Sequence, residues 1–358
     1  MSGRPSFDTF VVGSLPRPRW VLDVIDDRKA GRLSPEEADK LFDAAIPSAV
    51  RLQERAGLTY VSDGEWRRES YIKVFSEHVD GFATVPRQAI VAGAVPDPGV
   101  VSELRAREPI TAGAASFLLS LTSHRTIVTI PSPFILGWRL WDPVASVGAY
   151  ASRDDFMDAC VPILRAELQA LRDLGVDHVQ IDEPWLLMLG DPAHRERYGA
   201  DDYEREIERC VTVVNAVLEG LTGLPTSLHL CHGHFKRQRA TSGGYDPIIQ
   251  ALGRFHVDRL AMEFAAVESQ GVSVLADFPE DKILGLGVID HCDPRIETPE
   301  DVVARAEAAM RYVPAERLTL NPDCGFAPGS QNPVDLDEAY LKLHALCRGA
   351  ELLRERYG

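Results

Sequence analysis

Short runs of apolar and β-branched residues recur along the chain, and longer amphipathic stretches separate most of them. Continuous apolar runs are typical of parallel strands that are covered on both faces. Eight such strands alternating with helices predict an α/β fold, the closed (β/α)₈ TIM barrel. The runs that we interpret as strands are Thr9–Val12, Thr59–Ser62, Thr126–Ile130, Asp177–Ile181, Thr226–Leu230, Arg259–Glu263, Ile283–Val288 and Leu318–Leu320.

Capping signals predict where several helices begin. Ser34 lies just before Pro35 and three residues before Glu37, a capping box that opens a helix toward Arg55. The other predicted helices run from Ser152 to Leu174 with Gly175 as the C-terminal cap, from Thr298 to about Tyr312, and over Leu336–Tyr357.

We expect residues 1–358 to form a single domain, because 358 residues suit one large barrel. Residues 81–109 break the alternation and are rich in Pro, Gly and Val, which predicts a hairpin-like excursion inserted over one mouth of the barrel. The alternative fold is an open doubly wound sheet. Against it, the first run ends in Gly13-Ser14-Leu15-Pro16 and has no GxGxxG fingerprint.

Composition narrows the function classes. A net charge of −16 argues against nucleic acid and anionic membranes as partners, because such binding depends on Lys and Arg. The sequence has neither a signal-peptide pattern nor an apolar stretch of 18 residues, so we expect a cytoplasmic protein. Its six cysteines are scattered without a CxxC pair, which indicates reduced thiols that pack or bind a metal.

Residues of metal-binding type follow several predicted strands, whose carboxyl ends open onto one face of a barrel. His229 and Cys231 alternate on one strand, so their side chains share a face. Together with Cys324 and the harder oxygen ligand Glu263, they predict a Zn²⁺ site. His232 and His234 are rival ligands that we place in the following loop.

Other strand ends carry groups suited to substrate binding and proton transfer. Glu65 and Asp182 are candidates for binding a substrate ammonium group, with a helix cap or an ion pair with Arg67 or Arg68 as the less favoured alternative. Ser14 is a candidate for binding a substrate carboxylate or for capping a turn. His291 is a candidate general acid, although a structural histidine has the same sequence appearance.

Taken in order, these pieces resemble the cobalamin-independent methionine synthase family, in particular its catalytic C-terminal barrel. The resemblance covers almost the whole chain and is closest to the short, stand-alone form. It rests on Val12-Gly13-Ser14-Leu15-Pro16-Arg17-Pro18, Ser62-Asp63-Gly64-Glu65, Gln180-Ile181-Asp182-Glu183-Pro184, His229-Leu230-Cys231, Glu263, Gly287-Val288-Ile289-Asp290 and Asn321-Pro322-Asp323-Cys324-Gly325-Phe326.

The resemblance implies a zinc-dependent methyltransferase that acts on homocysteine and gives methionine. His229, Cys231, Glu263 and Cys324 match the family's zinc ligands, with Glu263 yielding to the incoming thiol. Asp182 and Glu65 match the carboxylates that bind the ammonium group, and Ser14 matches the loop at the substrate carboxylate. We assign catalysis to His291 and Asp182. The methyl donor is methyltetrahydrofolate or, as an alternative, a methylated corrinoid protein.

Three departures from the family pattern stand out. The full-length enzyme resembles two fused barrels and this chain has one. The family's strand-seven histidine falls nearer Cys292 than His291, and the acidic composition offers no basic groove for a polyglutamate tail. Two rival functions therefore stay open. One is an epoxyalkane:coenzyme M-type thiol alkyltransferase, against which Glu65 and Asp182 argue because that thiol carries no ammonium group. The other is a zinc- or thiol-binding protein without turnover.

Overall fold

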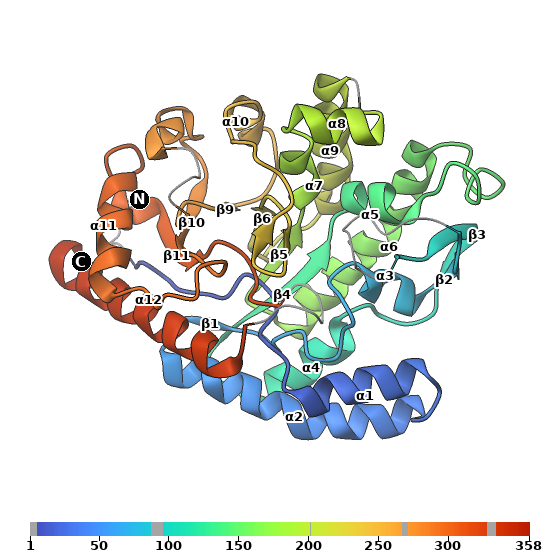
Figure 1. The fold of residues 1–358 in the computed structure, drawn as a ribbon, viewed down its shortest axis with the longest axis horizontal. Coiled ribbons are helices and arrows are strands. Elements are labelled where there is room, and N and C mark those ends of the chain that lie inside the picture. The colour runs from blue at the N-terminus through green and yellow to red at the C-terminus, as the bar shows by residue number, and fades with distance from the viewer. Residues whose placement is uncertain (1–5, 87–95, 201, 267–270, 328–333) are drawn as a thin grey trace.

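The computed structural model describes residues 6–86, 96–200, 202–266, 271–327 and 334–358. Its centre is a curled parallel sheet with helices around it, a mixed α/β fold of half-barrel shape (Figure 1). The strand order matches the order along the chain, so it lacks the reversal that defines a doubly wound sheet. Neighbouring strands are β1 (Tyr60–Val61), β4 (Arg125–Pro131), β5 (His178–Asp182), β6 (Thr226–Leu230), β9 (Arg259–Met262), β10 (Ile283–Ile289) and β11 (Leu318–Pro322).

Seven of the eight predicted strand runs fall on strands of this sheet. The first run, Thr9–Val12, forms a single parallel bridge between Thr9 and Leu320 of β11. On its other side, the Thr9 carbonyl accepts hydrogen bonds from the N–H groups of Thr59 and Tyr60, both at 3.0 Å. This segment therefore lies between the two edges of the sheet, and the count of eight strands stays a prediction.

The predicted helices follow their capping signals. The capping box of Ser34 and Glu37 opens α2 (Pro35–Ala56), and α6 (Arg153–Leu174) ends at Gly175 in the left-handed region. The helix α11 (Pro299–Ala309) stops short of Tyr312, and α12 covers Leu336–Tyr357 as predicted. The other helices are α1 (Arg19–Lys29), α3 (Lys73–His78), α4 (Ala112–Leu121), α5 (Pro133–Leu140), α7 (Pro184–Met188), α8 (Pro192–Tyr198), α9 (Tyr203–Leu218), α10 (Ile249–Leu252) and the 3₁₀ segments Val272–Asp277 and Ala315–Arg317.

Two antiparallel strand pairs lie outside the sheet. The strands β2 (Val79–Ala83) and β3 (Gly99–Ala106) pair within the region of the excursion predicted near residues 81–109. Residues 87–95 fall outside the described part of the chain, so the complete hairpin stays a prediction. The second pair, β7 (His234–Phe235) and β8 (Gln238–Arg239), follows β6 directly and returns toward the ends of the strands.

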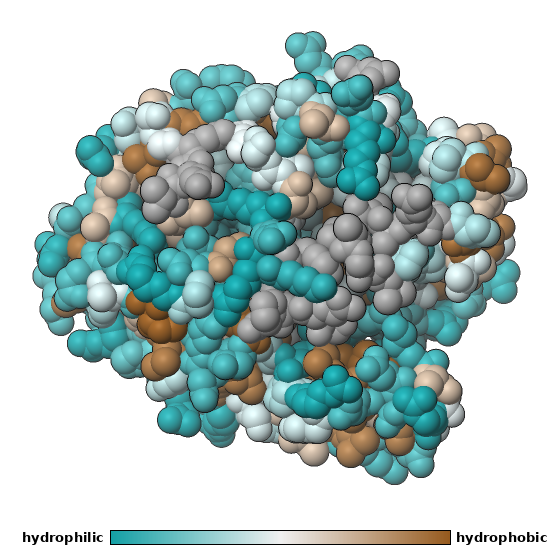
Figure 2. Space-filling model, viewed as in Figure 1, coloured by the Kyte–Doolittle hydropathy of each residue, from teal (hydrophilic) through white to brown (hydrophobic). Residues whose placement is uncertain are grey.

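Apolar side chains from the sheet and the surrounding helices form one large buried core, and a second small cluster consists of Phe10, Val12, Tyr60, Ile127 and Ala261. The described residues on the face seen in Figure 2 are mostly hydrophilic, with small and separated hydrophobic areas. Over the residues that the structure describes, we find no helix with the length and apolar character needed to cross a membrane.

Candidate metal and substrate site

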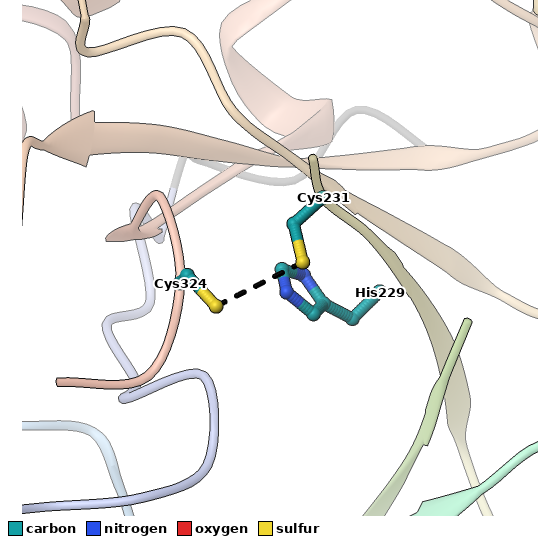
Figure 3. A group of neighbouring side chains, drawn as sticks. All are labelled: His229, Cys231 and Cys324. Atoms are coloured by element: carbon teal, nitrogen blue, oxygen red, sulfur yellow. Dashed lines mark hydrogen bonds between the residues drawn. The ribbon is translucent and has the colours of Figure 1, made fainter. Parts of the chain in front are cut away.

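Two thiols and an imidazole meet at the carboxyl end of the sheet. His229 is the fourth residue of β6, Cys231 follows that strand, and Cys324 lies in the turn after β11 (Figure 3). Their donor atoms all lie within 4.8 Å of one another, and each residue is at most 6% exposed. The Cys324 thiol donates to Cys231 Sγ at 3.8 Å. The structure therefore brings together three of the four predicted metal ligands.

The unpartnered nitrogens of His229 and the softness of the three donors both fit a metal at this place. Neither ring nitrogen of His229 has a hydrogen-bond partner of normal geometry, although the side chain is buried, and a buried polar atom normally has one. Burial alone lowers the pKa of His229, but Cys231, Asp182 and Glu263 together outweigh it and raise that pKa to about 9. Between the thiols, the hydrogen bond from Cys324 lowers the pKa of Cys231 and raises that of Cys324. One imidazole and two thiolates match zinc in softness.

Glu263, the fourth predicted ligand, is shared among other partners. One carboxylate oxygen contacts His232 Nδ1 and lies 4.0 Å from Arg239 Nε, and the other lies 3.3 Å from His234 Nε2. Glu263 groups with Cys231 and His234 within 4.8 Å, rather than with the set around His229. The structure thus joins Glu263 to the site through Cys231, and the arrangement of Glu263 beside His229 and Cys324 stays a prediction.

His234 lies closer to the candidate metal ligands than we expected from its position in the sequence after β6. It lies on β7, in the hairpin that folds back from β6, and belongs to two of the groups with metal-binding spacing. Gly233 makes this path possible, because it has a φ of 65° and a side chain there would meet Met188 Sδ at 2.8 Å. A glycine between two histidines was the signal in the sequence, but the returning hairpin was not predictable from it.

The turn after β10 brings His291 into the same group. The His291 ring lies 4.3 Å from the His234 ring, edge to face, and its nitrogen is within 4.8 Å of donors on His234 and Cys324. Burial lowers the pKa of His291 well below its ordinary value, so the imidazole is neutral at pH 7. The neighbouring Cys292 is partly exposed, and its Sγ lies 3.6 Å from His291 Nε2. Both residues group with Asp290 at metal-binding spacing, and His291 also groups with His234 and Cys324.

The predicted substrate carboxylates are buried at the ends of β1 and β5, the two strands that flank β4. Glu65 is 3% exposed, accepts a hydrogen bond from Thr129 Oγ1 at 2.5 Å, and lies 3.5 Å from Arg68 Nη1, one of its predicted ion-pair partners. Asp182 accepts from Gln180 Nε2 at 2.8 Å. Burial, opposed by His229 and reinforced by Glu65, raises the pKa of Asp182 to about 7.

Ser14 packs against the turn that carries Cys324. Its carbonyl accepts from the Phe326 N–H at 2.9 Å, and its hydroxyl accepts from the Ala327 N–H at 3.3 Å. Gly325 permits this packing, because a Cβ at that position would lie 2.8 Å from Ser14 Oγ. Ser14 therefore stabilises the turn that carries Cys324. Binding of a substrate carboxylate by the Ser14 loop stays a prediction.

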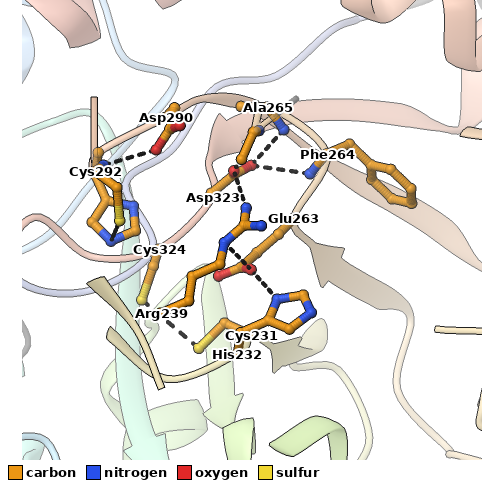
Figure 4. A network of polar contacts seen from close by, with 12 residues as sticks. Cys231, His232, Arg239, Glu263, Phe264, Ala265, Asp290, Cys292, Asp323 and Cys324 are labelled. Carbon is orange, nitrogen blue, oxygen red and sulfur yellow. Dashed lines mark hydrogen bonds and ion pairs between the residues drawn. The ribbon is translucent and has the colours of Figure 1, made fainter. Parts of the chain in front are cut away.

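Sequence reasoning missed the network behind Cys324. The Asp323 carboxylate accepts hydrogen bonds from the N–H groups of Phe264 and Ala265 at 3.0 and 2.9 Å, which fixes the chain after Glu263 (Figure 4). Burial raises the pKa of Asp323 to about 7. The Arg239 guanidinium lies between Asp323 and Glu263, at 3.8 and 4.0 Å. This network joins the ends of β9 and β11 behind the thiols.

Known proteins match along nearly the whole chain. The family model described as "Cobalamin-independent synthase, Catalytic domain" matches residues 7–343. Proteins named methionine synthase from Sulfurisphaera tokodaii and Saccharolobus solfataricus are each 26% identical over 357 residues. The match covers 99% of this chain and 95% and 97% of those proteins.

Solved structures share the fold. A B12-independent methionine synthase from Shewanella sp. W3-18-1, in complex with selenomethionine, superposes with a TM-score of 0.80 at 23% identity and covers 98% of each chain. A putative vitamin-B12 independent methionine synthase from Listeria monocytogenes gives a TM-score of 0.74 at 22% identity, covering 97% of this chain and 98% of that one. The half-barrel sheet therefore belongs to a known architecture of TIM-barrel type.

Proposed function

The chain belongs to the family of cobalamin-independent methionine synthases, which are methyltransferases, and from this premise we propose that it methylates the thiol of homocysteine to give methionine. The observation that carries the proposal is the buried meeting of His229, Cys231 and Cys324 at the carboxyl ends of the strands. Active sites of barrel enzymes form at this end, and the same end holds the acidic groups suited to an amino-acid substrate.

We infer that zinc is the metal and that His229, Cys231 and Cys324 hold it. Glu263 is the proposed fourth ligand, with His234 as the competing donor. When bound, zinc supplies the charge that keeps a substrate thiol, whose free pKa is about 8.5, in the thiolate form at neutral pH. The weaker carboxylate ligand is the one that we expect to give way to the thiol, because Glu263 already has His232 and His234 as alternative partners.

Glu65 and Asp182 are the proposed binding groups for the homocysteine ammonium. Glu65 is 3% exposed and Asp182 is 6% exposed. Electrostatic repulsion from Glu65 contributes to the raised pKa of Asp182. A substrate ammonium between them compensates for this repulsion and keeps Asp182 ionised. The loop of Ser14 is the proposed contact for the substrate carboxylate.

Methyl transfer forms a sulfur–carbon bond, breaks the nitrogen–carbon bond of the donor and leaves a nitrogen that must take up a proton. His291 and Asp182 are the proposed groups for this proton transfer. A neutral His291 retains one N–H that can be donated, and an Asp182 carboxylate that the bound ammonium keeps ionised is a base that can take up a proton. The proposed donor is 5-methyltetrahydrofolate. The matches to known proteins give no support to a methylated corrinoid protein.

Purified protein should be assayed with zinc, 5-methyltetrahydrofolate carrying one or three glutamates, and either homocysteine or coenzyme M. We expect methionine from homocysteine, little product from coenzyme M, and loss of activity in Cys231→Ser. The matched control is Cys210→Ser, because Cys210 is an equally buried thiol on α9, away from the site. Zinc binding without methionine formation from either donor overturns the proposal, and alkylation of coenzyme M alone replaces it with the rival activity.

A further inference from the structure

A fully buried lysine lies behind the turn that carries His291. Lys342, on α12, has no exposed surface, which is rare for this residue type. Its ammonium group makes three contacts: the carbonyls of Asp290 and Arg295, at 2.9 and 2.6 Å, and Glu297 Oε2, at 2.9 Å. One side chain therefore holds both ends of the turn formed by residues 290–295.

Glu297 completes the hold on the first residue of this turn. Its Oε1 accepts a hydrogen bond from the Asp290 N–H at 2.8 Å, while Lys342 donates to the Asp290 carbonyl. Arg305 adds a third charge, 3.4 Å from Glu297, and donates to the Val288 carbonyl at 2.6 Å. Both backbone groups of Asp290, the residue directly before His291, are thus fixed by the buried pair.

The same turn is also held by Arg237, a residue of the hairpin that lies at the candidate metal site. Arg237, in the hairpin that carries His234, donates to the His291 carbonyl at 3.3 Å and pairs through its guanidinium with Glu338 on α12. The backbone around His291 consequently has charged partners on two sides, and both sides lead to α12. The ring of His291 points to His234 and Cys324.

Burying an ammonium and a carboxylate costs solvation free energy, and apolar residues of similar size often give equal or higher stability. A buried pair is therefore poor evidence for a stabilising role. Here its bonds go to the backbone of one turn, and that turn presents an imidazole to the proposed metal. This is the arrangement expected of a group that sets a position.

We propose that Lys342, with Glu297, is a positioning residue that fixes the 290–295 turn and thereby the place of His291 in the site. The proposal rests on the proposed function, in which His291 takes part in proton transfer. It assigns to a buried residue on the last helix a role in the rate of methyl transfer, without contact to substrate.

The test is a double-mutant cycle of Lys342→Met and His291→Asn, read as kcat and KM for homocysteine with zinc content measured. Methionine keeps the length of the lysine stem and removes the charge. We expect Lys342→Met to lower kcat about 10- to 100-fold, as displacement of a catalytic group does, while KM changes less than about twofold. In the His291→Asn background, the same substitution should lower kcat less than about twofold, because the residue through which it acts is gone.

The matched control is Lys282→Met. Lys282 is also buried and paired, with Asp281 at 2.8 Å, but it precedes β10 at the end of the strand remote from the turn. An unchanged kcat in Lys342→Met, an equal loss in the His291→Asn background, an unaffected kcat in His291→Asn itself, or an equal loss in Lys282→Met overturns the proposal. If Lys342→Met does not fold, Glu297→Gln replaces it under the same criteria.

Crystal structures of the wild type and Lys342→Met separate this proposal from the proposed function. Displacement of residues 290–295 and of the His291 ring supports the positioning role even if the wild-type protein forms no methionine. An unmoved turn overturns that role even if methyl transfer is confirmed.

Discussion

Gly287→Ala is the substitution for which the structure predicts the largest effect from one added methyl group. Gly287 lies on β10, and a Cβ there would be 2.2 Å from Asp323 Oδ1 and 2.7 Å from the Met262 carbonyl. Displacing either atom breaks hydrogen bonds and therefore costs free energy. The Asp323 carboxylate is bonded to the N–H groups of Phe264 and Ala265, and Met262 pairs in the sheet with Leu286.

The cost follows from the bonds that must be lost. Displacing Asp323 breaks two hydrogen bonds to a buried carboxyl group, each worth about 1.5 kcal/mol at the lower end for charged acceptors, so we expect a loss of about 3 kcal/mol. With an unfolding entropy of about 2.1 cal/mol/K per residue, this lowers Tm by about 4 °C. Cys324 follows Asp323 directly, and loss of such outer support weakens metal binding about 10- to 100-fold.

Thermal unfolding and chelator competition for zinc measure the two effects separately. The control is Gly113→Ala, at an exposed position of α4 where an added Cβ meets nothing within 4 Å. There we expect unchanged zinc affinity and a gain of up to about 1 kcal/mol from helix propensity. If Gly287→Ala keeps the wild-type Tm and zinc affinity, the argument that Asp323 holds the site is wrong.

Three further predictions concern single residues. Cys324→Ser should abolish stoichiometric zinc binding, measured by elemental analysis after dialysis, whereas Cys160→Ser on α6 should retain it. Glu65→Gln should raise KM for homocysteine about 10-fold or more with little change in zinc content, because a charge-assisted bond to the ammonium is lost; an unchanged KM would contradict the assignment. Backbone and Arg295 hydrogen bonds lower the pKa of Asp301 to about 2, so its stabilising effect is present above pH 3.8 and is lost as the pH falls through about 2. Asp301→Asn should therefore cost about 1 kcal/mol or less at pH 7, since the carboxylate is 35% exposed, and less at pH 3, as urea unfolding would show.

The parts of the fold that the sequence predicted are those governed by local rules. Apolar runs identified the strands because a parallel sheet covered on both faces needs apolar residues in unbroken sequence. Ser34 and Ser152 identified helix starts because their hydroxyls cap N–H groups only three residues away. Thr9–Val12 has the same composition as the other runs, yet it forms a single bridge. Its pairing depends on the edges of a sheet assembled from residues about 50 and 310 positions later.

The same distinction between local and tertiary causes applies to the residues of the candidate site. His229, Cys231 and Cys324 were predictable because strand ends of a parallel sheet meet on one face, and alternation orients the first two. The neighbours of Glu263 could not be predicted from the sequence, because they depend on a hairpin. Its turn residues Lys236 and Arg237 adopt positive φ.

Few side chains accept that conformation without compensation, and here the compensation is tertiary. Arg237 pairs with Glu338 on α12, 101 residues away. The last helix therefore fixes both the hairpin that carries His234 and, through Lys342, the turn that carries His291. No local pattern links α12 to the thiols, although its charged groups contact the segments that carry His234 and His291. The proposed metal ligands on the strand ends can thus be predicted from the sequence of the strands, whereas the side chains around them depend on tertiary contacts with the last helix.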